Sequence, residues 1–573
     1  MARMNAIAPA IVILGAGALD TARRIQARYP GAQVHGLSGR VDADVAYTEL
    51  NAHLRDLYRR GTPLVALCAA GIVIRCLAPL LADKGTEPPV LAVAEDGSAV
   101  VPLLGGLAGV NRMAREIADA LDVTPAITTS GELRFGTCVL NPPDGYALSS
   151  LAQGKRFVSD LLAGESTRIE GEAPWLDNAQ LPRSADARLA IRVTPQAWNG
   201  STDELLIHPR SVVAAIGDLD EDIAGRVQGA LSANGIATLA LAALLAPVER
   251  AGEAALTEAA ATLGVALRFV ATPATASEAR KPHALISTAM RVPHEILAGD
   301  TPVALALARA PVDPSSVGQA RGRLCVIGLG PGDARLLVPA AREALDAATD
   351  VLGYETYVTM AGPFRADQRV HGTDNREEMQ RARHAFELAA GGASVVMVSS
   401  GDPGVFAMAA AVLEALHESG NARWASVELE ILPGVSAAMA TAAQAGAPLG
   451  HDFCMLSLSD NLKPWDVIEN RLRHAASADL VMAFYNPVSR ARPWQLDRAL
   501  DIVREFRAPE TTVVLGRNVG RPGGAVRHTS LGELRSDMVD MRTMVIIGSS
   551  LTRAFSVDGK VEWVYTPRWY RPL

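Results

Sequence analysis

Four short loops rich in glycine, proline and small polar residues recur in the second half of this 573-residue chain. Each follows an apolar run typical of a buried strand. The loops read GLGPGD from Gly328, SSGDPGVFAMA from Ser399, LPGVSAAM from Leu432 and AFYNPVSRARPW from Ala483. Glycine lets a backbone approach a ligand closely, and parallel sheets collect their ligands at the carboxyl ends of strands. The order and spacing of the loops therefore predict one ligand-binding cleft.

The first of these loops does not fit a dinucleotide. That fingerprint needs glycine at its first, third and sixth positions. Counting from Gly328, the sixth position is Asp333, and counting from Gly15 in a similar turn near the amino terminus it is Asp20. Neither loop continues into the Gly-Lys-Ser/Thr of a phosphate-binding loop. A nicotinamide oxidoreductase is therefore disfavoured, and the eleven histidines show no spacing that indicates a metal site.

The composition excludes several classes of protein. The net charge is −8 and aromatic residues make up 5%, which disfavours a nucleic-acid-binding surface. The five cysteines are odd in number and include no CxxC pair, so we expect reduced thiols in a cytoplasmic protein. The run AIVILGAGAL near the amino terminus indicates a buried strand entering a turn rather than a signal peptide. No apolar run reaches the roughly 20 residues of a membrane span.

Strand-like and helix-like segments alternate along the chain, which predicts a multidomain α/β protein. Residues 10–150 show this alternation, with PLVALCAAGIVI among the predicted strands. Residues 150–205 are polar and rich in proline, glycine and aspartate, and predict an irregular subdomain or connection. A smaller α/β unit follows at 211–309. The stretch 309–322 lacks apolar periodicity and predicts a linker before a self-contained α/β unit that runs to the carboxyl terminus.

Residues 322–573 resemble the tetrapyrrole methyltransferases, which use S-adenosylmethionine. GLGPGD, SSGDPGVFAMA and PGVSAAMATAAQAGAPLGHDF carry this resemblance. The longer segments LGYETYV, LSLSDNLKPWDVIENRL and FYNPVSRARPWQL are similar to the precorrin-3B C(17)-methyltransferases, which couple methylation to ring contraction in cobalamin biosynthesis. The resemblance implies a two-lobed tetrapyrrole methyltransferase fold with the cofactor between its lobes. It also implies a homodimer formed through this domain.

The same resemblance implies eight S-adenosylmethionine contacts. They are Pro331, Ser400, Gly401, Asp402, Val405, Ser436, Ala437 and Asn486. The Asp402 side chain has helix capping as an equal alternative. Methyl transfer requires a nucleophilic carbon held in line with a sulfonium and shielded from water, so the reaction needs no metal and no covalent nucleophile.

The implied substrate is a macrocycle bearing many carboxylates, which arginine forks suit. The candidate arginines are Arg365, Arg369, Arg376, Arg381, Arg383, Arg517 and Arg521. Most are expected to be solvated surface charges. Arg517 is the preferred substrate ligand, because it directly follows the predicted strand TTVVLG. Asp333 and His451 are candidate acid–base groups for ring contraction, with a capping role and a structural role as the respective alternatives.

Residues 10–309 resemble the cobalt-precorrin 5A hydrolases. The matching text runs from PLVALCAAGIVIRCLAPLLADKG to NRMAREIADAL and is followed by PAITTS. Leu107 stands where that family has the histidine of Ser-Gly-His, and Asp218 and Leu219 stand where it has Cys-Arg. Leucine neither moves a proton nor binds a carboxylate, so we expect no hydrolysis. 

The predicted domains are a hydrolase-like region at 1–205, a hydrolase-like carboxyl-terminal domain at 206–309, a linker at 310–322 and a methyltransferase at 323–573. The predicted activity is methylation of precorrin-3B at carbon 17 with ring contraction to precorrin-4. Two alternatives stay open. One is a bifunctional cobalt-precorrin 5A hydrolase and cobalt-factor III methyltransferase, and the other makes the amino-terminal half a non-catalytic tetrapyrrole-binding module.

Overall fold

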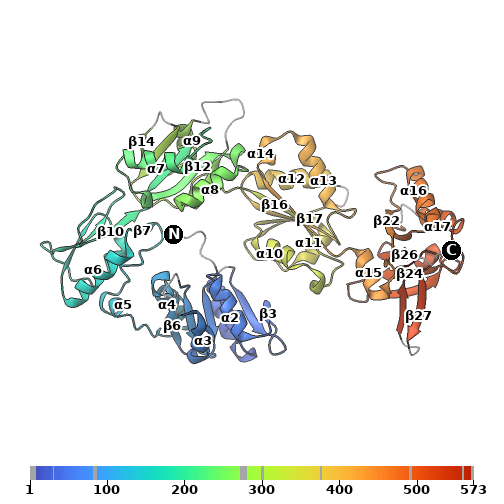
Figure 1. The fold of residues 1–573 in the computed structure, drawn as a ribbon, viewed down its shortest axis with the longest axis horizontal. Coiled ribbons are helices and arrows are strands. Elements are labelled where there is room, and N and C mark those ends of the chain that lie inside the picture. Colours follow the sequence, from blue (N-terminus) through green and yellow to red (C-terminus); the bar gives the residue numbers. More distant parts are fainter. Residues whose placement is uncertain are drawn as a thin grey trace. The chain divides into compact units, whose positions relative to one another are not determined.

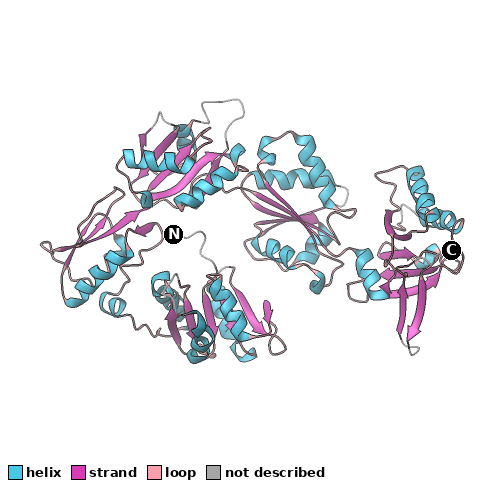
Figure 2. Cartoon of the chain, in the orientation of Figure 1, coloured by secondary structure: helices cyan, strands magenta, loops and turns pink. Residues whose placement is uncertain are grey.

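The computed structural model describes residues 8–29, 31–81, 87–271, 281–298, 302–374, 377–489, 493–557 and 561–569. The chain divides into two compact units, Met1–Ala320 and Arg321–Leu573. Helices and strands alternate in both units (Figure 2), which confirms the predicted multidomain α/β fold. Among the described residues, no helix combines the length and the apolar composition needed to cross a bilayer. All five cysteines are free.

The first sheet has six strands in the order β3-β2-β1-β4-β5-β6, coloured blue in Figure 1. They are β1 (Ala10–Ile13), β2 (Gln33–Leu37), β3 (Val45–Tyr47), β4 (Leu64–Leu67), β5 (Val90–Val93) and β6 (Val100–Leu104). β6 runs antiparallel to β5, and the other pairs are parallel.

Four helices flank this sheet: α1 (Leu19–Arg28), α2 (Leu50–Arg59), α3 (Ala70–Leu77) and α4 (Val110–Leu121). Helices α1 and α4 share one apolar core, whereas α2 and α3 share another. The prediction that PLVALCAAGIVI is all strand is wrong beyond Leu67. Helix α3 buries Val73 and Leu77 but leaves Ile74 exposed, a helical periodicity that the continuous apolar text conceals.

The prediction of an irregular subdomain or connection at 150–205 is wrong about the irregularity, because this stretch forms regular strands and a helix. A four-stranded sheet in the order β7-β10-β9-β8 occupies this part of the chain. Its strands are β7 (Tyr146–Leu148), β8 (Thr167–Glu170), β9 (Leu189–Val193) and β10 (Glu204–Pro209), and its helices are α5 (Ser130–Phe135) and α6 (Leu151–Ala163). The strands are short and widely separated, so their few buried residues, such as Leu189 and Ile207, give little periodic signal.

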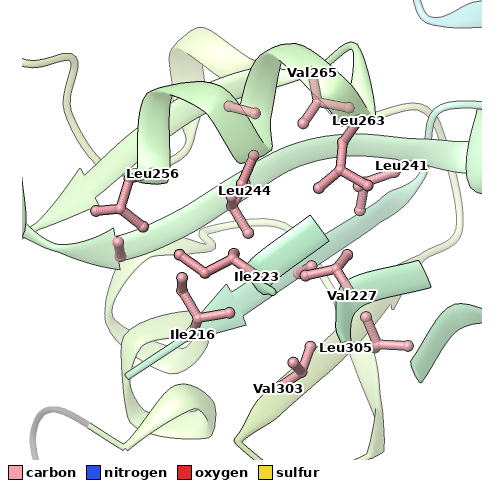
Figure 3. Close-up of a cluster of buried hydrophobic side chains, with 14 of the residues drawn as sticks. Ile216, Ile223, Val227, Leu241, Leu244, Leu256, Leu263, Val265, Val303 and Leu305 are labelled. Atoms are coloured by element: carbon pink, nitrogen blue, oxygen red, sulfur yellow. The ribbon is translucent and has the colours of Figure 1, made fainter. Parts of the chain in front are cut away.

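The third sheet has the order β13-β12-β11-β15-β14. Its strands are β11 (Val212–Ile216), β12 (Leu241–Pro247), β13 (Ala266–Val270), β14 (His294–Ala298) and β15 (Val303–Ala308), with helices α7 (Ile223–Ala233), α8 (Ala254–Leu263) and α9 (Pro282–Ala289). Figure 3 shows α7 and α8 contributing Val227 and Leu263 to the same core as Leu244 and Leu305 of the strands. The stretch after β15 packs on this sheet, because Arg268 Nε donates to the carbonyl oxygen of Val317 at 2.8 Å.

The second unit begins with a parallel sheet in the order β18-β17-β19-β16-β20. Its strands are β16 (Arg323–Gly328), β17 (Asp350–Tyr354), β18 (Arg369–Thr373), β19 (Ser394–Ser399) and β20 (Glu428–Leu432). Its helices are α10 (Pro339–Ala347), α11 (Glu355–Ala361), α12 (Glu378–Ala390), α13 (Met408–Ser419) and α14 (Ala422–Ala425). β16 lies between β19 and β20, so the loops that follow these three strands leave the same edge side by side.

The second lobe is a mixed sheet in the order β22-β23-β26-β24-β25. Its strands are β22 (Phe453–Ser457), β23 (Val481–Tyr485), β24 (Thr512–Arg517), β25 (Ala525–Ser530) and β26 (Thr543–Ile547). Helix α15 (Ala437–Ala445) packs in one core with this sheet, and α16 (Trp465–Ser477) and α17 (Gln495–Arg504) pack in another. A small sheet joins β21 (Gly446–Ala447) to β28 (Val561–Tyr565) and β27 (Arg553–Val557).

Asp350 at the start of β17 is a fully buried carboxylate. It accepts hydrogen bonds from Arg369 at 2.7 and 2.8 Å, from His371 at 2.9 Å and from Thr349 at 2.8 Å. Burial alone would raise the pKa of Asp350, but these donors outweigh burial and lower the pKa to about 2. The carboxylate therefore ties β17 to the edge strand β18.

We expect Asp350→Asn to destabilise this unit by about 2 kcal/mol at pH 7. A depressed carboxyl pKa stabilises the fold fully above the unfolded pKa near 4, and the contribution is lost as the pH falls from about 4 to 2. Urea titrations followed by hydrogen exchange in β17 and β18 measure this. The control Asp367→Asn breaks only an exposed pair with Arg365 and should cost below about 0.5 kcal/mol. Equal losses in both variants would contradict the assignment.

Candidate functional site

Three loops meet at the edge formed by β16, β19 and β20. Gly330 N donates to Gly401 O at 3.1 Å, and Gly401 N donates to Gly330 O at 2.8 Å. A Cβ atom at Gly328 would lie 2.1 Å from Gly401 O, and one at Gly434 would lie 2.3 Å from the same oxygen. Neither position has room for a side chain, so glycine is required for the three backbones to come together.

Asp402 joins the second loop to the third. Its Oδ1 accepts from Gly404 N at 2.8 Å, and its Oδ2 accepts from Gly434 N at 2.9 Å. Helix α13 begins only at Met408, so the Asp402 side chain bonds loop backbone and caps no helix. Both carboxylate oxygens are thereby engaged in holding the loops in register.

The third loop leads into α15 of the second lobe. Ser436 is its N-cap, and Ser436 Oγ accepts from Met439 N at 3.3 Å. Gly401 faces this helix start, because a Cβ built on Gly401 would lie 3.6 Å from Ser436 Cα and 3.8 Å from Ala437 N. Gly401 has φ +68°, a backbone conformation that glycine adopts without strain. These residues form a narrow, backbone-lined surface between the two loops.

The fourth loop contacts the second and the third. The amide of Ala438 donates to the Tyr485 hydroxyl at 3.3 Å, and the Tyr485 ring lies 5.2 Å from that of Phe406. Asn486 Nδ2 donates to Ser457 Oγ at 3.1 Å. Phe406 and Asn486 both have positive φ, at +54° and +52°. For a bulky residue such as Phe406 this conformation costs about 1–2 kcal/mol, and such strain clusters at functional sites.

Val405 and Ser400 belong to the second loop as well. Val405 N donates to Asp402 O at 3.2 Å, which closes a turn, and Ser400 is half-buried directly after β19. Seven of the eight predicted cofactor residues thus lie on the first three loops, and Asn486 lies on the fourth, which contacts them through Tyr485.

Arg521 brings the β24–β25 hairpin against the first loop. Its Nε donates to Pro331 O at 2.9 Å. Gly520 packs on Pro331, because a Cβ there would lie 2.6 Å from the Pro331 ring. Burial raises the pKa of Tyr357 on α11, and the nearby positive charge of Arg521 opposes that rise. Arg521, Pro331 and Tyr357 therefore form one cluster beside the loops.

The preferred arginine, Arg517, has another partner. Its Nε donates to Asp540 Oδ2 at 2.9 Å, and its side chain is half exposed. The other candidates lie away from the loops or in the core. Arg365 and Arg369 pair with Asp367 and Asp350, Arg381 is buried against Thr373 and Met408, Arg383 is exposed on α12, and Arg376 lies outside the described residues.

The two candidate acid–base residues occupy different surroundings. Asp333 accepts from Arg335 N at 2.9 Å and pairs with the Arg335 guanidinium at 2.7 Å, and both hydrogen bonds lower the pKa of the Asp333 carboxyl. His451 lies between β21 and β22, where its Nδ1 accepts from Asp452 N at 2.7 Å. Asp333 is thus on the first loop, and His451 is on a separate one.

Sequence reasoning missed Gly434 and Tyr485 and undervalued Arg521. Gly434 had a signal, because it follows a strand within LPGVS, but only the fold shows that it abuts Gly401. The described residues contain no group of three or more His, Cys, Asp or Glu residues that could hold a metal ion. The loops form a largely backbone-lined surface with an arginine at one side, and the amides of Gly330, Gly401, Gly404 and Gly434 are engaged within the loops themselves.

The residues expected to have lost hydrolase chemistry lie in the first unit. Leu107 is 43% exposed on the turn between β6 and α4. Asp218 and Leu219 follow β11 in a turn that Arg250 holds, with Arg250 donating to Leu219 O at 3.0 Å. Neither position carries a proton-transfer group other than the Asp218 carboxylate.

Two family models match separate parts of the chain. Residues 323–535 match the family model described as Tetrapyrrole (Corrin/Porphyrin) Methylases, and residues 52–132 match the one described as Cobalamin synthesis G N-terminal. The Precorrin-3B C(17)-methyltransferase of Sinorhizobium sp is 52% identical over 249 residues, or 44% of this chain and 97% of that protein. The probable cobalt-factor III C(17)-methyltransferase of Salmonella typhimurium is 41% identical over 247 residues, or 43% of this chain and 99% of that protein. The solved structure of the methyltransferase CobJ is 50% identical, with 43% of this chain and 100% of that chain covered and a TM-score of 0.41.

The two α/β lobes and their glycine loops define a methyltransferase of the S-adenosylmethionine-dependent class. The chain belongs to the tetrapyrrole (corrin/porphyrin) methylase family, since it covers nearly the whole Sinorhizobium relative at 52% identity. The Sinorhizobium and Salmonella relatives are named as C(17)-methyltransferases, and the first unit contains a region that matches the model Cobalamin synthesis G N-terminal. The predicted family and the predicted fusion are confirmed.

We expect Asp402→Ala to loosen the third loop without unfolding the lobe. The Asp402 carboxylate accepts two backbone hydrogen bonds, so its removal leaves two amides without an acceptor. This loss should lower the local stability by about 1–3 kcal/mol. Hydrogen exchange at Gly404 and Gly434 should accelerate roughly tenfold or more. The control Asp333→Ala removes an acceptor for Arg335 alone and should leave Gly434 unchanged. Protected exchange at Gly434 in Asp402→Ala would contradict the role of this side chain.

Proposed function

We propose that this chain transfers a methyl group from S-adenosylmethionine to carbon 17 of precorrin-3B, with ring contraction to precorrin-4, in cobalamin biosynthesis. The observation that carries the proposal is the match of the second unit to nearly the full length of a precorrin-3B C(17)-methyltransferase. We assign the activity to residues 323–573. Residues 1–205 and 206–309 form the hydrolase-like part, and 310–322 join the two.

We place the proposed S-adenosylmethionine contacts on the glycine loops, where the backbone can approach a ligand closely. Gly401 leaves the space between the second loop and α15 free of side chains, and its neighbours Ser436 and Ala437 start that helix. The proposed contacts are Pro331, Ser400, Gly401, Asp402, Val405, Ser436, Ala437 and Asn486. The methyl donor would supply an electrophilic methyl group on a sulfonium. The chain would hold the donor through backbone groups, and Asp402 would keep the loops aligned.

The tetrapyrrole carboxylates require cationic partners beside the loops. Arg521 is the arginine in contact with Pro331, and its fork can bind a carboxylate while Nε keeps its bond to the loop. Arg517 stays a second candidate, although Asp540 already engages its Nε. We therefore propose Arg521 as the principal anchor for a substrate carboxylate.

Ring contraction requires proton transfers, for which Asp333 and His451 remain the candidates. The hydrogen bonds from Arg335 lower the pKa of Asp333, so its carboxyl is ionised near neutral pH and could accept a proton only as a weakened base. His451 would then be the group that donates a proton. The capping of Arg335 N by Asp333 supports the structural alternative for that residue.

We propose that the first unit does not hydrolyse the lactone of cobalt-precorrin 5A. Leu107 supplies no acid or base, and the turn at Asp218 and Leu219 offers no cysteine or arginine in place of the family pair. In the bifunctional alternative, other residues would have to supply the acid or base and replace the cysteine–arginine pair.

We also propose a homodimer formed through the methyltransferase unit. The β27–β28 hairpin exposes four large apolar side chains, which a monomer would leave in water. They are Phe555, Val557, Trp563 and Tyr565, each between 40% and 48% exposed. An apolar ribbon of this kind supports association with a second copy.

Incubation of the full chain with S-adenosylmethionine and precorrin-3B tests the activity. The product should gain one methyl group by mass and lose the absorbance of the uncontracted macrocycle. S-adenosylmethionine should bind at micromolar concentration, about 8 kcal/mol, and NAD should not. Calorimetry showing NAD binding without S-adenosylmethionine binding would refute the assignment.

We expect Gly401→Leu to abolish S-adenosylmethionine binding in a folded protein, because a side chain would fill the surface beside Ser436. The matched control is Gly420→Leu. Gly420 also has positive φ, at +56°, but faces open space at the end of α13, so it carries the same backbone strain without touching the loops. Calorimetry on both variants, with circular dichroism to verify folding, separates strain from loss of the site. Equal affinities in the two variants would contradict the proposal.

Arg521→Ala should raise the KM for precorrin-3B by about 10–100-fold, the value of one charge-assisted hydrogen bond. Arg517→Ala should change the KM for precorrin-3B less than about threefold, because Arg517 is already paired with Asp540. Arg521→Lys keeps the positive charge but loses the planar guanidinium fork. Its KM for precorrin-3B should lie between those of the unmodified protein and Arg521→Ala. An unchanged KM for precorrin-3B with a raised KM for S-adenosylmethionine would instead assign Arg521 to loop positioning.

The full chain should release no acetaldehyde from cobalt-precorrin 5A above a heat-denatured control. Leu107→His alone should not restore hydrolysis, because the second position at Asp218 and Leu219 is altered too. Acetaldehyde release by the unmodified chain, with methyl transfer intact, would establish the bifunctional alternative.

A further inference from the structure

The first unit encloses a cavity of about 570 Å³ that the methyl-transfer reaction does not use. The turn between β6 and α4, helix α5, the segment after it and helix α6 surround this cavity. Its volume lies within the range of about 300–1,000 Å³ typical of small-molecule sites. All of its walls belong to Met1–Ala320, so the cavity lies within one unit.

The walls of the cavity are predominantly apolar. Phe135 and Val139 form a buried surface, at 1% and 3% exposed, and belong to the core beneath the β7–β10 sheet. Leu107 and Leu151 line the cavity but remain 43% and 41% exposed, so they lie at its opening. A rigid floor and exposed leucines at the mouth are features of a site that takes an apolar ligand from solvent.

One buried carboxylate lines the same cavity. The Glu132 side chain is 3% exposed, and it accepts from Asn111 Nδ2 at 2.8 Å and from Arg115 Nη2 at 2.5 Å. Asn111 Nδ2 also donates to Thr129 Oγ1 at 2.9 Å, which fixes the wall further. A carboxylate has about four lone-pair positions, so two acceptor positions remain for a ligand N–H or O–H. The paired charge explains how the carboxylate is tolerated in a buried position.

The charges around the cavity select against anions. Its two charged lining residues are Glu87 and Glu132, and no lysine or arginine lines it among the described residues. A ligand with several carboxylates would find no lining cation among the described residues, because Arg115 is already paired with Glu132, and an apolar wall does not replace the water that those carboxylates would lose. A polycarboxylate tetrapyrrole therefore does not match this cavity, whereas an uncharged or singly cationic molecule with a donor does.

We propose that this cavity is a binding site for a mostly apolar, uncharged or singly cationic small molecule that donates a hydrogen bond to Glu132. The site is independent of the methyl-transfer loops. Leu107 lies at the opening of the cavity and would contact the apolar part of the ligand, although its side chain cannot transfer a proton.

Two matched dyes test the proposal on the full chain. N-phenyl-1-naphthylamine is uncharged, apolar and carries an N–H, and 8-anilinonaphthalene-1-sulfonate has the same ring skeleton with an added sulfonate. The uncharged dye should bind saturably at one site per chain, at least tenfold more tightly than the sulfonate. It should also slow hydrogen exchange in α5 and α6. Binding of the sulfonate with equal or higher affinity would overturn the charge argument.

Substitutions at the mouth locate the dye. Leu107→Trp and Leu151→Trp fill the opening from partly exposed positions and should each weaken binding of the uncharged dye at least tenfold. The control Leu133→Trp lies on α5 but is 66% exposed and outside the lining, so it should leave the affinity unchanged. Leu107→Lys should reverse the preference toward the sulfonate. Unchanged binding in both filling variants, or an equal loss in the control, would exclude this cavity as the site.

Discussion

The absence of a Cβ atom at Gly328 and Gly434, which both abut the carbonyl of Gly401, is the constraint on which the second unit depends. The Gly401 carbonyl oxygen lies where a side chain on either of the other two glycines would have to be. Because the three backbones are this close, Gly330 and Gly401 can exchange hydrogen bonds and Asp402 can reach Gly434. The start of α15 is then held beside Gly401, and the two lobes share one continuous loop surface. In the proposed activity, binding would depend on that backbone contact more than on any one reactive side chain.

Much of this arrangement could be predicted from the sequence, because glycine, proline and aspartate at the ends of apolar runs leave few other interpretations. What could not be predicted was pairing at long range. Arg517 and Arg521 are four residues apart in the text, and only the path of the β24–β25 hairpin shows that one meets Asp540 and the other meets Pro331. Asp402 could be assigned to a cap or to a ligand, but not to Gly434, which is 32 residues away. Short strands such as β7 and β8 were missed because three or four residues carry too little periodicity.

The proposed binding sites of the two units differ in the charged residues that they would present to an anionic ligand. The loops of the second unit lie beside Arg521, which suits a substrate rich in carboxylates. The cavity of the first unit is lined by Glu87 and Glu132 and by leucine and phenylalanine side chains. A fold related to a cobalamin-pathway family therefore carries a pocket whose electrostatics disfavour an anionic tetrapyrrole. Under the proposals above, the residues present at Leu107 and at Asp218 and Leu219 would affect what this unit recognises as well as what it can catalyse.

The strand order of the second unit also constrains its biosynthesis. β16 is the first strand of the unit to leave the ribosome, yet its neighbours β19 and β20 end at Ser399 and Leu432. The first loop therefore cannot acquire its partners until roughly a hundred further residues have been translated, and Arg521 arrives later still. Until then both edges of β16 lack their partner strands and its apolar side chains lack their packing neighbours. A ligand surface assembled from the earliest and latest parts of a unit becomes competent only once its synthesis is nearly finished.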